Sequence, residues 1–249
     1  MHTWRRIAAI LTTLMLAAPL IGADQAKRVV AIPVLNYHSI GDSPGNIYML
    51  RPDHFARQMD YLAAHQYTPL TLQEFALILE KKKVAPDKPV LLTFDDGYAS
   101  NYELAMPVLK SHDFPATVFI LPGMVGQGAY LSWPQIREMR ENKWDVQPHT
   151  MTHPHLPQLA AEAQREEIVT SRHEIERQLG TVADVFAYPY GEYNETTLGI
   201  LQEAGFRYAF TTLPGMATSA QPPLELHRIV VQEGDSFRTW KRKLKKNTH

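Results

Sequence analysis

The stretch Thr93-Phe94-Asp95-Asp96-Gly97 follows directly on the apolar run Pro89-Val90-Leu91-Leu92. Such a run is typical of a buried strand, and this one ends in two adjacent carboxylates and a glycine. Side chains that follow one another along a strand point to opposite faces, so the two acids cannot perform the same task from a regular strand. The pattern therefore predicts two roles at the rim of the fold, one acid for a cation and one for a proton. The alternative is that Asp96 and Gly97 form only a turn.

Composition limits the classes to which the protein can belong. The 249 residues suffice for one domain of α/β-barrel size or for two small domains. A net charge of -1 gives no reason to expect a nucleic-acid partner. The absence of cysteine excludes disulfides, thiolate metal sites and cysteine nucleophiles.

The first residues have the pattern of an export signal. The basic segment Trp4-Arg5-Arg6 precedes a largely apolar stretch at 7–21, and Gly22-Ala23 offers small residues for cleavage. The apolar stretch is short for a membrane span, which needs about 20 residues. We expect residues 1–23 to be a signal peptide and the protein to be periplasmic, extracellular or associated with the cell surface. An uncleaved membrane anchor is the alternative.

Strand and helix patterns alternate along the rest of the chain. This alternation is typical of an α/β protein with a largely parallel sheet or barrel. The expected strands cover residues 31–37, 89–94, 116–121, 144–146, 185–188, 206–210 and 229–231. The expected helices cover residues 52–64, 71–83, 100–111, 160–179 and 194–204, with a short one after Ser132.

A second polar stretch is Pro148-His149-Thr150-Met151-Thr152-His153-Pro154-His155. His149 and His153 are four residues apart, so on a turn of helix or a tight loop both rings can reach one ion. With one Asp they form a His2Asp set that leaves positions open for water and substrate. The zinc-protease pattern H-E-x-x-H places its base beside the first His, where this chain has Thr150. The base must therefore come from elsewhere, and the second acid of the Asp pair supplies one. A histidine-rich surface loop is the alternative.

Three motifs, in this order, resemble those of a known family: Thr93-Phe94-Asp95-Asp96-Gly97, His149-Thr150-x-x-His153 and Pro189-Tyr190-Gly191. They are similar to the first three motifs of the polysaccharide deacetylases of carbohydrate esterase family 4, the NodB homology domain. The resemblance covers roughly Val90 to the C-terminus. The upstream segments 33–38, 55–62 and 69–72 resemble the branch of exported poly-N-acetylglucosamine deacetylases.

The resemblance implies an α/β fold, a distorted (β/α)7 barrel in a single domain, with a groove across its top. We divide the chain accordingly into three parts. Residues 1–23 are the signal peptide, residues 24–87 an N-terminal strand and helices packed on the barrel, and residues 88–249 the NodB homology deacetylase domain.

The resemblance also implies roles for single residues. Asp95 corresponds to the catalytic base, and Asp96 to the metal-binding acid. His149 and His153 correspond to the other two metal ligands. Tyr190 corresponds to a residue that contacts the substrate and whose backbone N–H helps to hold the oxyanion, which also makes it a catalytic residue.

Less specific matches complete the expected site. Leu226 and His227 resemble the final motif, in which a Leu lines the acetate pocket and a His is the general acid. Ala187 stands where the family has an Arg that orients the base, and we expect another cation, such as Arg228, to replace it. The fourth motif has no match near residues 210–212.

Two further residues are candidates for substrate binding. Trp133 could replace the missing groove aromatic, although an ordinary core Trp is the alternative. His38 stands at the C-terminal end of the first expected strand, where α/β folds place functional groups.

The activity implied by the resemblance is hydrolysis of N-acetyl groups on an extracellular polysaccharide that contains N-acetylglucosamine. The expected cofactor is a divalent metal, Zn2+ first, with Co2+, Ni2+ or Mn2+ as substitutes. Three alternatives remain: an O-acetyl esterase, a glycan-binding relative with little catalysis, and a non-haem Fe(II) oxygenase, whose facial triad has the same ligand types. The basic tail around Lys241-Arg242-Lys243 could contact a membrane or cell-wall surface, or it could be a solvated final helix.

Overall fold

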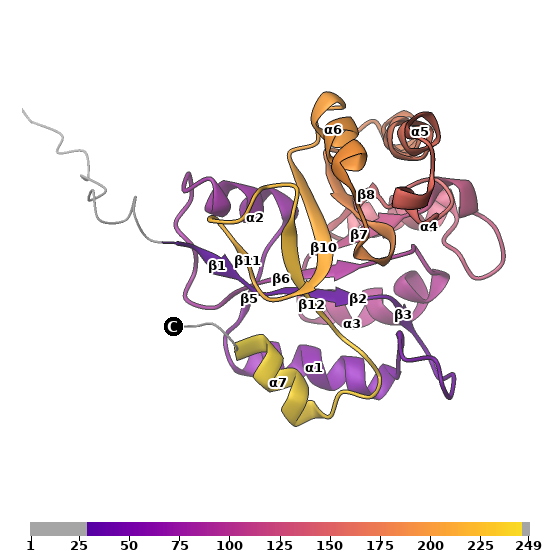
Figure 1. The fold of residues 1–249 in the computed structure, drawn as a ribbon. Coiled ribbons are helices and arrows are strands. Elements are labelled where there is room, and N and C mark those ends of the chain that lie inside the picture. The colour runs from indigo at the N-terminus through magenta and orange to yellow at the C-terminus, as the bar shows by residue number, and fades with distance from the viewer. Residues whose placement is uncertain (1–28, 246–249) are drawn as a thin grey trace, which may run out of the picture.

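The computed structural model describes residues 29–245, so the predicted signal peptide lies outside the described residues. The described chain forms a nearly closed barrel of parallel strands with helices around it (Figure 1). This confirms the expected distorted (β/α)7 barrel and its single domain. Seven strands are hydrogen-bonded in the order β8 (Trp144–Pro148), β7 (Ala116–Ile120), β6 (Pro89–Phe94), β2 (Val34–Tyr37), β12 (Leu226–Val230), β10 (Tyr208–Pro214) and β9 (Val185–Ala187).

Short strands extend this sheet or lie beside it. β5 (Thr68–Pro69) pairs with β6. Two small pairs consist of β1 (Ala31–Ile32) with β11 (Ala217–Thr218), and of β3 (Ser39–Ile40) with β4 (Met49–Leu50).

The first barrel strand comes from the part of the chain before residue 88. β2 lies between β6 and β12, with Tyr37 opposite Phe94 in the register. A division of the chain at residue 88 therefore separates strands of one barrel. Because parallel strands end at the same edge of a sheet, the residues that follow β2, β6 and β8 meet there.

The helices cover the outside of the barrel. They are α1 (Pro52–Ala64), α2 (Leu72–Leu79), α3 (Met106–Ser111), α4 (Trp133–Glu141), α5 (Ala161–Leu179), α6 (Glu195–Glu203) and α7 (Phe237–Lys245), with a π-helix (Asn101–Ala105) before α3. Short 3-10 turns cover Pro122–Met124, Leu156–Gln158 and Pro189–Gly191. A capping box begins α2, with Thr71 as N-cap and Glu74 as its partner. No helix within residues 29–245 is long and apolar enough to cross a membrane.

Two elements differ from the sequence prediction in a way that affects the site. The last barrel strand begins at Leu226, three residues before the expected start, because Arg228 is buried in the sheet rather than exposed in a loop. The neighbouring barrel strand, β10, runs on to Pro214, and its register with β12 shifts between Phe210 and Pro214. Periodicity alone could not show a strand that carries a buried arginine.

Candidate metal and catalytic site

A cavity of about 970 Å³ opens where the strands β2, β6 and β8 end. Ligand pockets generally range from about 300 to 1,000 Å³, so this volume is at the upper end. The cavity is lined by six of the residues that the sequence singled out, which are His38, Asp95, Asp96, His149, His153 and Tyr190.

Asp96, His149 and His153 form a potential metal site. The Oδ1 atom of Asp96 lies 3.4 Å from Nε2 of His149 and 3.4 Å from Nε2 of His153. The three ligand atoms all lie within 4.8 Å of one another. Asp96 Oδ1 is buried and has no hydrogen-bond partner among the described residues, as expected of an oxygen that binds a cation. The residues therefore fit a divalent metal with nitrogen and oxygen ligands.

Two hydrogen bonds between the first and last strands of the barrel order, β8 and β9, fix the orientation of His149. Side chains of β8 and its next residue bridge these two strands. Gln147 Oε1 accepts from the backbone N–H of Val185 at 3.1 Å, and His149 Nδ1 donates to the carbonyl of Ala187 at 2.7 Å. A proton on Nδ1 leaves the Nε2 lone pair directed to the metal site.

The two histidines differ in basicity. Burial opposes a charge on His149, but the nearby carboxylates of Asp96 and Asp95 outweigh burial and raise its pKa. Burial lowers the pKa of His153 to about 4, assisted by the charge of His149. At neutral pH His153 is therefore a free ligand, whereas a metal competes with a proton for His149 up to a higher pH than for an ordinary histidine.

The loop that carries these histidines is held by a residue that the sequence did not single out. Glu167 of α5 accepts from the backbone N–H groups of Met151 and Thr152 at 2.8 and 2.9 Å, and from the Thr152 hydroxyl at 2.7 Å. Thr150 and His153 have positive φ values of 70° and 68°. Non-glycine residues rarely adopt this conformation, and such strain is found mainly at functional sites.

Asp95 is held by three charged or polar donors. Arg228 donates from Nη1 to Oδ1 at 2.8 Å and from Nη2 to Oδ2 at 2.7 Å. Asn36 of β2 donates to Oδ2 at 2.7 Å. Burial alone would raise the pKa of Asp95, but the Arg228 guanidinium outweighs it and, with His149, holds that pKa well below its usual range.

Arg228 is the cation that contacts Asp95 in this chain, which has Ala187 at the position of the family's arginine. It is fully buried, and its Nε donates to the carbonyl of Thr211 at 3.0 Å. Bidentate pairing of this kind fixes both the position and the charge of a carboxylate. The expectation that another cation contacts Asp95 is met by this ion pair.

Tyr190 lies at the rim of the cavity, with its ring half exposed. Its φ is 60°, and the ring contacts His153 edge-on and stacks on His155 with centroids 4.0 Å apart. His155 in turn pairs with Glu192 at 2.8 Å. The following Gly191 is required, because a Cβ there would lie 2.7 Å from the backbone N of Thr212. These contacts fix the backbone of Tyr190 beside the metal ligands.

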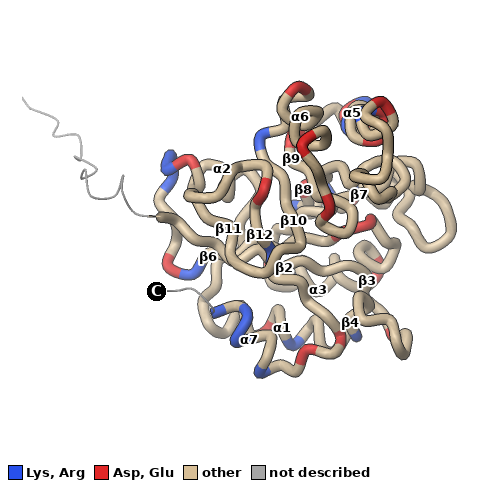
Figure 2. Tube along the Cα trace, viewed as in Figure 1, with Lys and Arg blue, Asp and Glu red and all other residues tan. Residues whose placement is uncertain are grey.

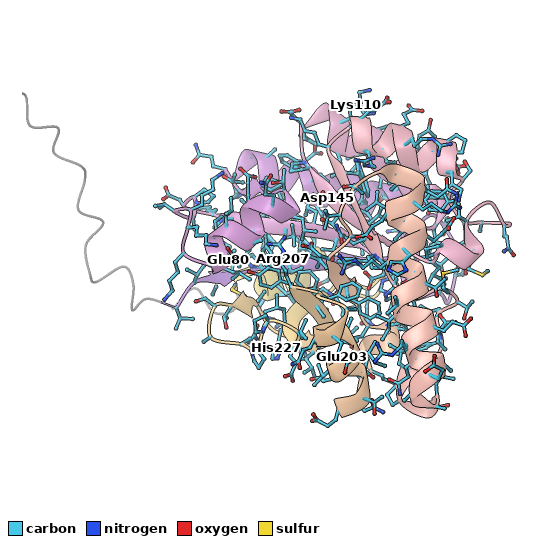
Figure 3. The ribbon with its side chains drawn as sticks, turned by 90° about the horizontal axis from the view of Figure 1, so that it is seen from above. Glu80, Lys110, Asp145, Glu203, Arg207 and His227 are labelled. Carbon is cyan, nitrogen blue, oxygen red and sulfur yellow. The ribbon has the colours of Figure 1, made fainter. Side chains whose placement is uncertain are left out.

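Three predicted site residues, Leu226, Trp133 and His227, do not line the cavity, so their expected roles stay predictions. Leu226 is buried in the apolar interior, and Trp133 packs against the core. His227 follows Leu226 and precedes Arg228 on β12, and it packs beside Gly215 (His227 is labelled in Figure 3). Alternate strand residues face opposite sides, so Arg228 points to the site and His227 does not.

His38 is the histidine that the structure places in the cavity instead. Its ring lies against Tyr48, with centroids 4.8 Å apart. Its Nδ1 is buried and has no hydrogen-bond partner among the described residues. Burial lowers the pKa of His38, partly offset by the carboxylates of Asp95 and Asp96.

Comparison with known proteins shows the family of the chain. The family profile described as Polysaccharide deacetylase matches residues 82–209, half of the chain, including both acids and both histidines. The chain belongs to the polysaccharide deacetylase family. The expectation of an enzyme, a hydrolase of this family, is therefore confirmed.

Individual deacetylases cover most of the chain. YxkH of Bacillus subtilis, which carries the polysaccharide deacetylase name only provisionally, is 34% identical over 212 residues, covering 85% of this chain and 75% of its own. The poly-β-1,6-N-acetyl-D-glucosamine N-deacetylase of Staphylococcus epidermidis is 30% identical over 206 residues, with coverages of 77% and 71%. The Streptococcus pyogenes deacetylase PplD, solved with acetate, is 32% identical with a TM-score of 0.83, covering 87% of this chain and 99% of its own.

Proposed function

We propose that the protein is a metal-dependent N-deacetylase that releases acetate from an extracellular polysaccharide containing N-acetylglucosamine. The observation that carries this proposal is the placement of Asp95, with its bidentate partner Arg228, beside the ligand set Asp96, His149 and His153. The similarity to a poly-β-1,6-N-acetyl-D-glucosamine N-deacetylase supports the choice of substrate.

The ligand set suits Zn2+ first, because imidazole and carboxylate ligands in a small open site are typical of catalytic zinc; Co2+, Ni2+ or Mn2+ could substitute. When bound, such a metal would lower the pKa of a water molecule toward about 7 and polarise the amide carbonyl. Asp96, His149 and His153 would hold it.

The remaining steps belong to residues of this chain. Asp95 accepts the proton of the attacking water, and Arg228 and Asn36 keep its carboxylate in place. The backbone N–H of Tyr190 donates to the oxyanion that develops on the carbonyl. His38, rather than His227, donates a proton to the leaving amine, because it is the histidine outside the ligand set that lines the cavity.

Of the three alternatives, the glycan-binding relative and the Fe(II) oxygenase are disfavoured by observations on the site. A glycan-binding relative without catalysis was suggested by Ala187, but Arg228 restores the cation beside Asp95 and favours catalysis. An O-acetyl esterase would use the same groups on a different carbonyl. The Fe(II) oxygenase alternative is disfavoured, since such a triad requires no second acid held by an arginine.

The substrate is tested by acetate release from a panel of β-1,6-linked and β-1,4-linked N-acetylglucosamine oligomers, peptidoglycan and acetylated xylan. We expect release from at least one N-acetylated substrate. Release from the O-acetylated xylan alone would contradict the amide specificity while leaving the metal site intact.

Export rests on the predicted signal at residues 1–23, outside the described residues. We expect mass spectrometry of protein from its native host to show an N-terminus near Asp24. An intact Met1 on protein in the cytoplasmic fraction would contradict export, and an intact Met1 in the membrane fraction would indicate an anchored form.

A further inference from the structure

The catalytic cavity extends beyond the acid and histidine cluster to the C-terminal helix α7. Its lining there includes Val230 and Gln232, at and after the end of β12, and Arg242 and Lys243 of α7. Among the described residues that line the cavity, these two cations are the only formally charged side chains outside the catalytic cluster. This end of the cavity is therefore positively charged.

The position of α7 is fixed by its apolar face. Trp240 and Leu244 are buried, and the Trp240 ring lies edge-on to Tyr61 of α1 with centroids 5.6 Å apart. Lys and Arg positions follow one another along the helix (Figure 2), and α7 contains no acidic residue. The basic side chains consequently stay at this end of the cavity.

The two cations in the lining differ in how far their charge is balanced. Lys243 Nζ donates to Asp235 Oδ2 at 2.6 Å and to the carbonyl of Val230 at 3.1 Å, so a carboxylate offsets its charge. Arg242 is exposed and makes no hydrogen bond or ion pair with any described residue. Arg242 is thus the unbalanced charge in this part of the lining.

We propose that Arg242 selects the charge of the sugar unit that lies beside the reacting unit, on the side of α7. This inference rests on the proposed function, since deacetylation converts a neutral amide into an ammonium group. A unit that is already deacetylated brings that ammonium toward Arg242 and is repelled. An N-acetylated unit is neutral, and a unit with a carboxylate is attracted. The enzyme therefore prefers an acidic neighbour to an acetylated one, and an acetylated neighbour to a deacetylated one.

The expected size of this preference follows from the exposure of Arg242. An interaction between exposed charges changes an equilibrium by about 1.5-fold to fivefold. The acidic neighbour is attracted and the deacetylated neighbour is repelled, so the two factors multiply and we expect about twofold to 25-fold between them in wild type. In about 1 M salt the screening length falls to about 3 Å, and the preference should vanish.

The test compares wild type with Arg242→Glu on two sets of oligosaccharides at low ionic strength. One set alternates N-acetylglucosamine with glucuronic acid, and the other alternates N-acetylglucosamine with glucosamine. The measured quantity is the ratio of kcat/KM for the acidic set to that for the cationic set. Because Arg242→Glu reverses both the attraction and the repulsion, we expect this ratio to fall by at least about fivefold and the difference from wild type to vanish in about 1 M sodium chloride.

Arg238→Glu is the matched control. Arg238 is exposed on the same helix, one turn earlier, and does not line the cavity. The control should keep the wild-type ratio. An equal fall of the kcat/KM ratio in both variants, or no fall in Arg242→Glu, would overturn the proposed role of Arg242. Equal loss of binding to phosphatidylglycerol vesicles with unchanged ratios would identify α7 as a surface-binding helix instead. If wild type released no acetate from any N-acetylated substrate, the proposed function itself would fail.

Discussion

Arg228 reaches Asp95 across an intervening strand, because β12 and β6 both flank β2 in the sheet. Both side chains are almost fully buried, so each charge depends on the other for its solvation. We expect Arg228→Met to leave a buried carboxylate unpaired and to lower the free energy of unfolding by about 3–5 kcal/mol. Denaturant unfolding measures this loss, and stability within about 0.5 kcal/mol of wild type would contradict it.

The same pair makes a prediction about pH. The pKa of Asp95 in the folded state is lowered from the unfolded value of about 3.9. Its stabilisation is therefore fully present above that value and is lost only as the pH falls toward the lower folded pKa.

If Arg228→Met does not fold, Arg228→Lys keeps the charge without the bidentate geometry. That variant should bind metal normally yet have a reduced kcat.

Two histidine variants test which residue donates the proton. The sequence predicted His227, and we propose His38. His38→Gln should lower the rate of acetate release by about 10²–10⁴-fold, the usual contribution of general acid–base catalysis, with metal content unchanged. His227→Gln is the matched control and should keep near wild-type activity, because His227 lies outside the cavity lining. The opposite pattern would restore His227 as the general acid.

Metal affinity should depend on pH through His149 alone. His149, with its raised pKa, is protonated up to a pH above the ordinary histidine value of about 6.5, whereas His153, with a pKa of about 4, is not. Each metal bound between pH 5.5 and 6.5 should therefore release about one proton. Competition with a chelator across this range measures the slope, and a slope of about two or of zero would contradict the assignment.

At the scale of elements, the site depends on tight turns at the ends of β8 and β9. Gly191, with a φ of 75°, lies against Thr212 and leaves no room for a Cβ. Gly191→Ala should cost about 2–4 kcal/mol of stability through strain and overlap, and it should displace the Tyr190 amide and reduce kcat.

Gly199, in the middle of α6, is the control for this substitution. A Cβ there meets no atom within 4 Å, so Gly199→Ala should stabilise the protein by up to about 1 kcal/mol and leave activity unchanged. Unfolding curves and acetate release of both variants provide the comparison. Equal stability of the two would show that the turn tolerates a side chain.

The elements show which parts of the site the sequence could predict. Helix α1 was predicted with its observed bounds, Pro52–Ala64, because Pro at the first turn and a regular apolar face mark it locally. The side on which His227 lies could not be predicted, since it depends on where β12 begins. Glu167 could not be recognised either, because it is one of several acids on a charged helix. Its role follows only from the packing of α5 beside the histidine loop.

At the scale of the whole molecule, barrel closure brings together groups that are distant in the chain. Asn36, Asp95, His149 and Arg228 come from or directly follow four different strands and meet at one edge. The motif order predicted this meeting for the metal ligands, because each motif follows a strand pattern. The contributions of Asn36 and Arg228 required the sheet order, which places β2 and β12 beside β6.

The central claim is that this site performs metal-dependent amide hydrolysis with Asp95 as the base. The most direct test measures acetate release and metal content together, for untagged wild type and Asp95→Asn, each after chelation and after addition of Zn2+. The account predicts that chelation abolishes release by wild type and that Zn2+ restores it. Folded Asp95→Asn should bind Zn2+ equally well yet release acetate about 10²–10⁴-fold more slowly. Near wild-type turnover by Zn2+-loaded Asp95→Asn, or undiminished turnover by metal-free wild type, would contradict the account.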